Sequence, residues 1–517
     1  MILNVKNIGE IGIINDISPV ELPPNAWTSG KNIRIENGYV KKHLGQSSVY
    51  ATVLTSPYWI VPIQTGSTYY WVYGGLTKTY QTDQSTHTEI TKSVTTYGAT
   101  ALTRWNGGVL NGIVIANNSV DNPQQWTGSG LMTDLSNWPA STKAKVIRPF
   151  LYHLVALDVT ESSTRYPRMV RWSHPADPGA VPSTWDYTDT TKDAGRVELS
   201  ETGGFCIDCL PLRNTNVIYK EDSVWGMQYI GGQSKFRFFS MFEEFGVFSR
   251  DCAKEFYGKH VVLGKDDIVV HDGQSMKSIV DARHRKWLQG KLAAVGSFSE
   301  NAFVCANYQN SEMLFCLPES AAATGCTLAL VWNWRDGSFG VRDLPGIYHA
   351  NNGLVTPSTT STQWDTDTQS WATDATTWDQ LTYSNAAQKL LMATPGATPK
   401  LHLFEDTEQF DGINMTSNIE RTGLALGGSE QVNLITRIWP RMETSPTGSP
   451  VNIYVGSQMT TADTVTWNGP YLFDPSTQQY VDCLVSARYH GIRFESTTNI
   501  SWKLNSYDIE YEPMGVH

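Results

Sequence analysis

The stretch "KHVVLGKDDIVVHDGQSMKSI", residues 259–279, decides the fold that we expect for most of the chain. Two short runs of Val, Ile and Leu are separated by Lys265-Asp266, and the second run ends at Asp272-Gly273. β-Branched residues favour strands, and Asp-Gly pairs favour tight hairpin turns. The stretch therefore predicts consecutive antiparallel strands joined by short turns.

Similar turn signals recur along the chain at a regular spacing. They lie near positions 37, 74 and 112 in the first part of the sequence, and near 222, 266 and 310 further on. This spacing is typical of four-stranded propeller blades, which are about 40–50 residues long. Residues 51–350 are therefore predicted to form a β-propeller-like body of roughly six blades. A pair of β-sandwiches, which also contain regular short strands, is the alternative.

The remaining segments complete an all-β prediction. Alternating apolar residues return after position 401, for example in "PVNIYVGSQ" (450–458), and predict a β-sandwich over residues 401–517. Residues 1–50 are expected to form an N-terminal docking segment with a first hairpin, and residues 351–400 a Thr-, Asp- and Trp-rich excursion. Few short helices are expected, over residues 281–295 and 385–394.

The bulk composition narrows the function classes. The formal net charge is −11, whereas a protein that grips nucleic acid through its phosphates is basic on at least one face. This balance fits either an ordinary soluble surface or a duct through which DNA slides. No run of about 18 apolar residues is present, so no membrane insertion is expected. The N-terminus is interrupted by polar residues and is not expected to be a signal peptide.

Residue patterns for catalysis or cofactor binding are absent from the sequence. It contains no G-x-S-x-G, no phosphate-binding glycine loop and no H-E-x-x-H. Of the seven cysteines, only Cys206 and Cys209 form a C-x-x-C, on a predicted strand and without a second pair for zinc. We therefore expect no enzyme activity, no cofactor and no metal. The cations at 283–286 are expected to form a solvated helix face rather than a nucleic-acid site.

Three tryptophans, Trp364, Trp371 and Trp378, recur every seven residues in "WDTDTQSWATDATTWD" (364–379). Thr and Asp disfavour a helix here, and a calcium loop lacks its glycine and further ligands. Two interpretations stay open. The tryptophans either anchor the loop to its own domain or dock on a neighbouring subunit, where Trp is often an energetic hot spot. Binding of sugar rings is a third, weaker interpretation.

The stretch "GIINDISPVELPPNAWTSGKNIRIENGYVKKHLGQ" (12–46) resembles the start of tail-nozzle proteins of short-tailed bacteriophages, also called tail tubular protein B or tail hub. The likeness lies in an ordered set of features: Asp16, Glu21 to Pro23, Asn25 to Trp27, Asn32, Arg34, Gly38, Lys42 and Gly45. Segments 165–186, 193–204 and 217–232 also look like this family.

The resemblance implies a structural virion protein made in the bacterial host cytoplasm. Such a protein forms a ring, usually of six copies, below a tail adaptor, and carries a tail fibre or spike. The ring continues the channel through which genomic DNA leaves, without sequence-specific binding. Asn25, Trp27 and the three repeated tryptophans become candidate interface residues. A receptor- or glycan-binding tail module is the alternative function, and a propeller glycosidase is a third.

Overall fold

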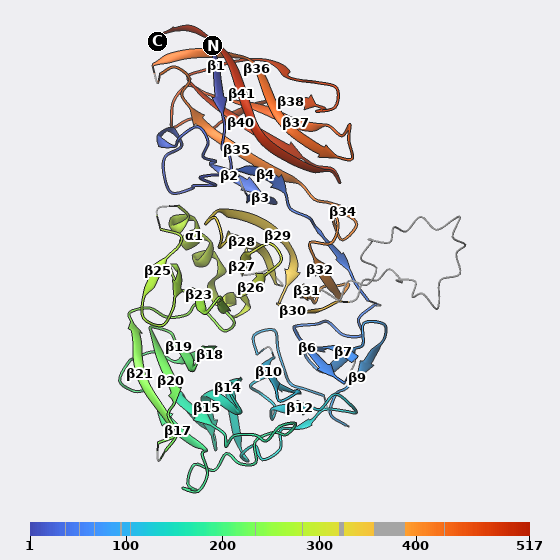
Figure 1. Cartoon of the computed structure of the whole chain (residues 1–517), viewed down its shortest axis with the longest axis vertical. Helices are drawn as coiled ribbons and strands as arrows, with labels where there is room; N and C mark the ends of the chain where they lie inside the picture. The colour runs from blue at the N-terminus through green and yellow to red at the C-terminus, as the bar shows by residue number, and fades with distance from the viewer. Residues whose placement is uncertain are drawn as a thin grey trace, which may run out of the picture.

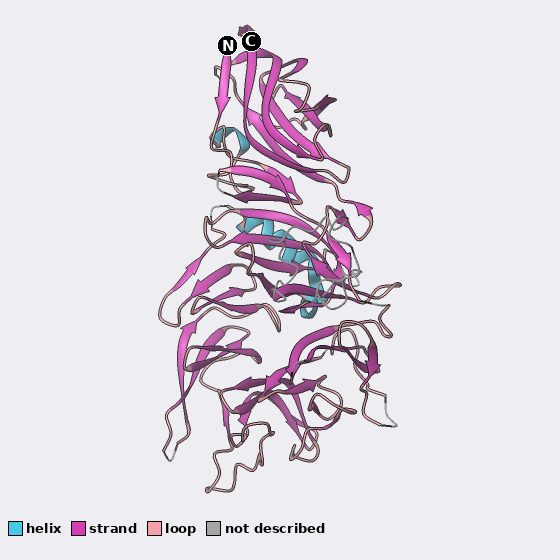
Figure 2. Ribbon diagram, turned by 45° about the vertical axis from the view of Figure 1, so that its right-hand side comes forward, coloured by secondary structure: helices cyan, strands magenta, loops and turns pink. Residues whose placement is uncertain are grey.

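Antiparallel strands form nearly all of the regular structure, as Figures 1 and 2 show. The computed structural model describes the chain except residues 37, 51, 67, 94–95, 104, 233, 282, 320–324, 356–387, 429 and 517. The described strands form six four-stranded sheets, one mixed six-stranded sheet and a two-sheet sandwich. The expected all-β class, with a propeller-like body and a terminal sandwich, is confirmed.

The six four-stranded sheets follow one another along the chain and are arranged around a common axis (Figure 1). Their strands are β6 (Trp59–Thr65), β7 (Thr68–Gly74), β8 (Thr79–Thr82) and β9 (His87–Glu89); β10 (Asn106–Leu110), β11 (Ile113–Asn117), β12 (Gln124–Trp126) and β13 (Thr133–Asp134); β14 (Thr142–Phe150), β15 (His153–Glu161), β16 (Thr164–Trp172) and β17 (Gly195–Glu198); β18 (Cys206–Leu212), β19 (Thr215–Lys220), β20 (Ser223–Tyr229) and β21 (Phe236–Glu243); β22 (Ala253–Phe256), β23 (Lys259–Leu263), β24 (Ile268–His271) and β25 (Met276–Ser278); β26 (Phe303–Asn307), β27 (Glu312–Leu317), β28 (Cys326–Asn333) and β29 (Phe339–Ile347).

A seventh sheet closes the ring with strands from two distant parts of the chain. It consists of β30 (His349–Leu354), β31 (Gln388–Thr394), β32 (Lys400–Phe404), β5 (Gln46–Ser48), β33 (Gln409–Phe410) and β34 (Ile413–Asn414), in that order. Buried apolar clusters lie between successive sheets. One of them packs Ile60 and Trp71 of the first sheet against Leu391 and Leu403 of the seventh. The body is therefore a closed propeller of seven blade-like sheets, one more than roughly six.

The sandwich is built from both ends of the chain. One sheet contains β1 (Ile2–Val5), β3 (Ile33–Glu36), β4 (Tyr39–Lys42), β36 (Gln431–Ser445), β39 (Val481–Ala487) and β41 (Ser501–Val516). The other contains β2 (Ser29–Lys31), β35 (Ser417–Leu424), β37 (Val451–Gln458), β38 (Thr466–Phe473) and β40 (Tyr489–Ser496). The two termini therefore lie side by side (Figure 1).

These strand partners place the domain boundaries differently from the expectation for residues 1–50 and 401–517. Strands β1 to β4 complete the sandwich, because Ile33, Ile35 and Val40 pack into its core. Residues 401–414 belong to the seventh blade. Antiparallel sheets with free edges accept strands from any part of the chain, so composition along the sequence does not fix such a boundary.

Helices are few, as expected. In the described residues the only α-helix is α1 (Arg285–Val295), between the fifth and sixth sheets, with the short 3₁₀ helices η1 (Pro19–Glu21) and η2 (Gly296–Asn301). No helix in the described part of the chain is long and apolar enough to cross a membrane. The helix expected over 385–394 is wrong: β31 occupies Gln388–Thr394 because it pairs with β30 and β32 in the seventh sheet.

Gly45 permits the close approach that closes the ring. A Cβ atom at this position would lie 1.8 Å from the carbonyl oxygen of Gln409, and the Gly45 N–H donates to the Thr407 carbonyl over 2.5 Å. Gly45→Ala is therefore expected to destabilise the protein by about 1–3 kcal/mol, the usual cost of overpacking. Urea unfolding followed by fluorescence measures this.

Gly396→Ala is the matched control, because a Cβ atom there meets nothing within 4 Å. Its unfolding midpoint is expected to stay near that of the wild type. Equal midpoints for the two variants would show that the contact of Gly45 with Gln409 does not constrain the closure.

Candidate functional site

The two domains meet at a buried cluster of charged side chains, which we call the junction cluster: Arg34, His43, Glu312, Arg342 and Glu405. Arg34 comes from β3 of the sandwich, and Arg342 and Glu312 come from β29 and β27 of the sixth blade. Glu405 follows β32 with a left-handed φ of 56°. All five side chains are at most 6% exposed.

Hydrogen bonds join every member of the junction cluster. Arg34 donates from Nε and Nη2 to the two Glu312 carboxylate oxygens over 2.6 and 2.7 Å, a bidentate pair. Arg34 Nη2 also contacts Glu405, and Arg342 Nη1 lies 3.1 Å from Glu405 Oε1. His43 Nδ1 lies 3.0 Å from the same Glu405 oxygen. Planar guanidinium groups suit such shared carboxylate binding.

Electrostatics hold Glu405 in its charged form. Burial alone raises the pKa of its carboxyl group, but the hydrogen bond with His43 and the two guanidinium groups lower that pKa well below its ordinary value. Burial and the nearby Arg34 guanidinium lower the pKa of His43, so its ring is neutral near pH 7. Two guanidinium groups then balance two carboxylates, and the cluster is neutral as a whole.

The cluster also meets a simple distance test for a metal site, which it fails on chemical grounds. Ligand atoms of His43, Glu312 and Glu405 lie within 4.8 Å of one another. However, the same carboxylate oxygens already accept hydrogen bonds from Arg34 and Arg342. A divalent cation placed there would face two guanidinium charges in a buried site. We interpret the cluster as an ionic link between the domains.

Neighbouring residues of the 12–46 segment extend this link. Asn32, at a φ of 56°, donates to Asp343 Oδ2 and to the Thr416 carbonyl over 2.9 and 2.7 Å. Lys42 is buried and donates to the Glu408 carbonyl of the seventh blade over 3.3 Å, and within the sandwich to the carbonyls of Thr498 and Ile500, each over 3.0 Å. Asn tolerates left-handed backbone better than most residues, which explains its place at this turn.

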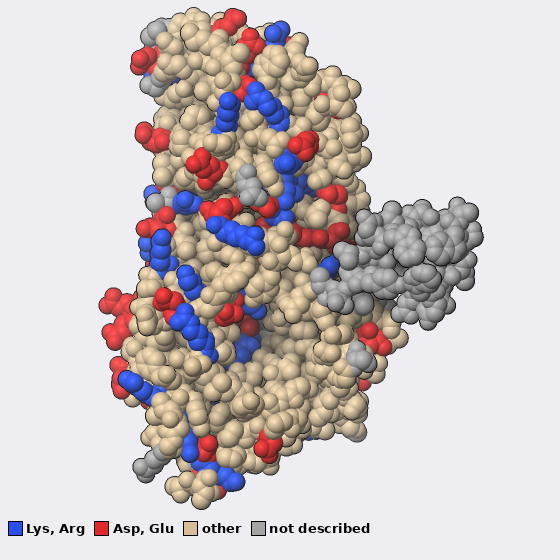
Figure 3. All heavy atoms as spheres, viewed as in Figure 1, with Lys and Arg blue, Asp and Glu red and all other residues tan. Residues whose placement is uncertain are grey.

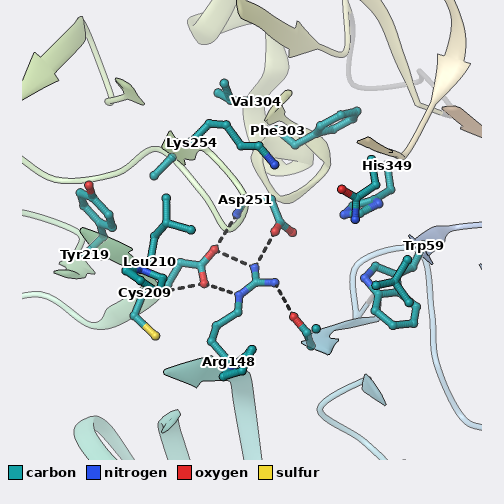
Figure 4. A pocket seen from close by; sticks show the side chains of 18 of the residues that line it. Trp59, Arg148, Cys209, Leu210, Tyr219, Asp251, Lys254, Phe303, Val304 and His349 are labelled. Carbon is teal, nitrogen blue, oxygen red and sulfur yellow. Dashed lines mark hydrogen bonds and ion pairs between the residues drawn. The ribbon is translucent and has the colours of Figure 1, made fainter. Parts of the chain in front are cut away.

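A second site is the axial cavity, which lies where the first strands of all seven blades converge. Its volume is about 270 Å³, and its lining includes Arg148, Asp208, Asp251 and Lys254. Arg148 donates to both Asp208 oxygens over 2.8 Å, to Asp251 over 2.5 Å and to the Gly107 carbonyl over 3.1 Å. Figure 4 shows these contacts, and Figure 3 shows a hollow in this face of the propeller with charged atoms inside it.

The predicted interface residues differ in their location and exposure. Trp364, Trp371 and Trp378 lie outside the described residues. Trp27 is 1% exposed, donates to the Ile8 carbonyl over 2.7 Å and packs on Tyr507 in the sandwich core. Its side chain is therefore not available as a contact surface. Asn25 is partly exposed and lies 3.4 Å from the Asn7 carbonyl.

The cations at 283–286 do not form a continuous basic face. His284 is buried against Phe339, and Arg283 donates to the Gly337 carbonyl. Arg285 lies 3.7–3.9 Å from three aspartates, Asp266, Asp267 and Asp281. Pairing with acidic neighbours is what the solvated-face interpretation expects.

Cys206 and Cys209 are both free thiols in β18. Burial raises the pKa of each thiol to about 12, so neither is a thiolate near neutral pH. The two cysteines of this C-x-x-C are therefore packing residues of the blade.

Glu312 and Glu405 were missed by the sequence reasoning. Glu312 begins the strand "EMLFCL" (312–317) and Glu405 follows "KLHLF" (400–404), and a carboxylate at the end of a largely apolar strand is a signal of burial. Arg34 belongs to the 12–46 segment that resembles nozzle proteins, but the sequence does not indicate its partners.

Comparisons with known proteins give little further information. The sequence matches no family model, and no curated protein matches it. One similar solved structure is the AfRom2 CNH domain, with 9% sequence identity, 71% of this chain and 99% of that chain covered, and a TM-score of 0.37. The propeller architecture therefore stands on the sheets and inter-sheet clusters of the chain itself.

Proposed function

We propose that this chain is a structural subunit of the tail nozzle of a short-tailed bacteriophage, a ring that conducts DNA during ejection. One observation carries the proposal. Three residues of segment 12–46 through which the sequence resembles nozzle proteins, Asn32, Arg34 and Lys42, join the sandwich to the propeller. A fourth, Gly45, lies beside the strand that closes the propeller.

Residues that carry the sequence resemblance therefore also have a structural role. Arg34 is at the centre of the junction cluster, and Gly45 precedes the strand that closes the propeller. The motif spans 35 residues and supplies contacts that hold one two-domain body together. Turn-forming residues alone explain such a motif less easily. The motif thus supports assignment to proteins built on the same plan.

The other similar segments also have structural roles in the blades. Within 165–186, Arg171 donates to the Trp185 carbonyl over 2.9 Å and so holds the long loop that follows β16. Lys220, in segment 217–232, donates to the Thr202 carbonyl of segment 193–204 over 2.8 Å. Strand β16 of the first segment also pairs with β17 of the second, so the three segments support one another across the third and fourth blades.

A channel lining for DNA needs repulsion or neutrality more than binding. The net charge of −11 disfavours adhesion to phosphates, and electrostatic attraction is the main source of non-specific DNA affinity. Under this proposal DNA passes without sequence-specific contacts, and the chain acts by assembly with a tail adaptor and a tail fibre or spike rather than by catalysis.

Alanine at Trp364, Trp371 and Trp378 together is expected to leave the monomer folded and to abolish the ring. An interface hot spot contributes about 2 kcal/mol or more, so three such losses in every copy prevent assembly. Native mass spectrometry of the wild type and the variant measures the oligomer, and thermal unfolding measures the fold.

Alanine at Thr366, Thr373 and Thr376 is the control within the same segment, and it is expected to assemble normally. Loss of monomer folding in the tryptophan variant would instead mean that the repeat anchors its own domain. An intact ring in that variant, together with weaker binding to host glycans, would favour the receptor-binding alternative.

A further inference from the structure

One edge of the propeller presents exposed side chains from three neighbouring blades. Arg213 and Tyr257 are in the turns after β18 and β22, the first strands of the fourth and fifth blades, and Tyr308 follows β26 in the sixth blade. Trp334 follows β28, the third strand of the sixth blade. Strands alternate in direction within an antiparallel blade, so the turns after the first and third strands lie at the same edge. We call Arg213, Tyr257, Lys259, Tyr308 and Trp334 the turn cluster.

Aromatic rings form the centre of the turn cluster. The rings of Tyr257 and Tyr308 each lie 6.1 Å from the Trp334 ring, measured between centroids, at interplanar angles of 73° and 64°. Phe256 is buried, and its ring lies 5.6 Å from that of Trp334. Tyr257 is 74% exposed and Tyr308 is 42% exposed. Both tyrosines therefore keep ring surface open to solvent.

Tyr257 occupies a backbone conformation that its side chain disfavours. The two-residue turn Tyr257-Gly258 joins β22 to β23 with φ angles of 47° and 70°. In such a turn, Asn, Asp or Gly usually supplies both positive φ angles, and a bulky residue there is strained. Because the ring is mostly exposed, packing offsets little of this strain. Strained residues cluster at functional sites, so an exposed ring at this position indicates a binding role.

Two cations flank the rings. Arg213 is exposed, and its Nη2 donates to the Gly258 carbonyl over 3.3 Å. Lys259 is exposed and pairs with Phe256 across the turn, so the two side chains are on the same face of the fifth blade. That face meets the sixth blade, since Phe256 packs on Trp334. Lys259 is therefore placed toward the aromatic rings.

Carboxylates balance these cations. Glu255 Oε1 accepts a backbone N–H of the same turn over 2.9 Å, and the register of β23 with β24 places Asp272 opposite Lys259. The turn after β28 adds one charge of each sign, from Arg335 and Asp336. The surface around the rings therefore offers donors and acceptors of hydrogen bonds without a net charge.

A saccharide is the class of ligand that these features fit best. A pyranose ring has an apolar face of C–H groups, which can pack on an aromatic ring, and a rim of hydroxyl groups, each of which both donates and accepts. Single-stranded nucleic acid also stacks on aromatic rings, but it relies on a positively charged groove. The balanced charges of the turn cluster do not provide one.

We propose that the turn cluster binds a neutral saccharide. Tyr257 and Tyr308 receive the C–H faces of its pyranose rings. Arg213 and Lys259 donate to its hydroxyl groups, and Glu255 accepts from them. The inference goes beyond the nozzle proposal and does not require a ring of copies, because one chain supplies the whole cluster.

Ligand-observed NMR titration of the full chain with maltotetraose, cellotetraose and chitotetraose tests the proposal. At least one of these oligosaccharides is expected to bind saturably, with a Kd below about 5 mM. Tyr257→Asn is expected to weaken that binding at least about tenfold, and Tyr257→Phe, which keeps the ring, at most about threefold. Lys259→Met, which removes one donor, is expected to weaken it about threefold. Tyr152→Asn is the control, because Tyr152 is 58% exposed in the corresponding turn of the third blade, and it is expected to bind as the wild type does.

The melting temperature separates a binding role of Tyr257 from a structural one. Tyr257→Asn is expected to melt at the wild-type temperature or above, since asparagine adopts the left-handed region more readily than tyrosine. Should that variant not fold, Tyr308→Ser is expected to weaken binding at least about threefold. The absence of saturable binding of all three oligosaccharides up to about 10 mM overturns the proposal, as does equal affinity in the wild type and Tyr257→Asn. Displacement of the saccharide by an equimolar single-stranded oligothymidylate also overturns it, in favour of a nucleic acid.

Discussion

Glu405→Gln is expected to lower the free energy of unfolding by about 3–5 kcal/mol, the cost of removing one partner from a buried ion-pair network. Glu405 is the carboxylate that Arg34, His43 and Arg342 share. With glutamine in its place, one buried guanidinium charge has no counter-ion. Urea unfolding followed by tryptophan fluorescence measures the loss.

Because the junction cluster links the sandwich to the propeller, the same variant is also expected to separate their unfolding into two calorimetric transitions. Glu443→Gln is the control, since Glu443 is 67% exposed and lies 3.8 Å from Lys503. An exposed pair contributes about 0–1 kcal/mol. A loss of less than 1 kcal/mol for Glu405→Gln would contradict the role given to the cluster.

Lowering the pH from 6.5 to 4 is expected to remove several kcal/mol of stability. Burial lowers the pKa of four histidines, His260, His271, His284 and His490, from 6.5 to about 4. Between these values the unfolded chain binds more protons than the folded one, so stability is present above pH 6.5 and is lost toward pH 4. Each fully shifted histidine corresponds to roughly 3 kcal/mol, at about 1.4 kcal/mol for each pH unit.

Other groups modify this dependence without reversing its sign. Burial raises the pKa of the Glu408 and Glu420 carboxyl groups, so their protonation favours the folded state and offsets part of the loss. Below about pH 4 the paired carboxylates add to the loss, because the pKa of Asp411 is lowered to about 2: burial opposes the shift, but Lys400 and His402 outweigh it. Thermal unfolding from pH 7 to pH 4 measures the sum.

Substitution of His260 and His271 together isolates their part of the pH dependence of stability. The Tyr219 hydroxyl lies 2.7 Å from Nδ1 of His260 and 2.7 Å from Nε2 of His271, and His260 Nε2 lies 2.9 Å from the Pro211 carbonyl. Replacing both histidines with glutamine is expected to flatten the pH dependence, whereas His174→Gln at a partly exposed position serves as control. An unchanged slope in the double variant would contradict this account.

The blades could be predicted because their signals are local. Lys265-Asp266 and Asp272-Gly273 mark the ends of strands that pair with their immediate neighbours, and Gly273 has the left-handed φ of 92° that its turn requires. The seventh blade could not be predicted in this way. Its strand β5 pairs with β32, more than 350 positions later, and the propensity of residues 388–394 for helix was outweighed by their place inside that sheet.

The same limit applies to the sites. Arg34 was part of a recognised motif, but its partners Glu312 and Glu405 are 278 and 371 positions away. Lys254 lies in an unremarkable strand sequence, and only the convergence of seven blades brings it to Arg148 and His349. Contacts of such sequence separation carry no pattern in a single sequence. Turn-forming residues predict the blades, whereas the cavity forms only when the ring of blades is closed.

Native mass measurement combined with negative-stain imaging of the full chain, alone and with the tail adaptor that the proposal implies, tests the nozzle proposal most directly. We predict a ring of several copies with a central hole wide enough for a DNA duplex, in at least the sample that contains the adaptor. A monomer in both samples across the accessible concentration range would contradict the proposal.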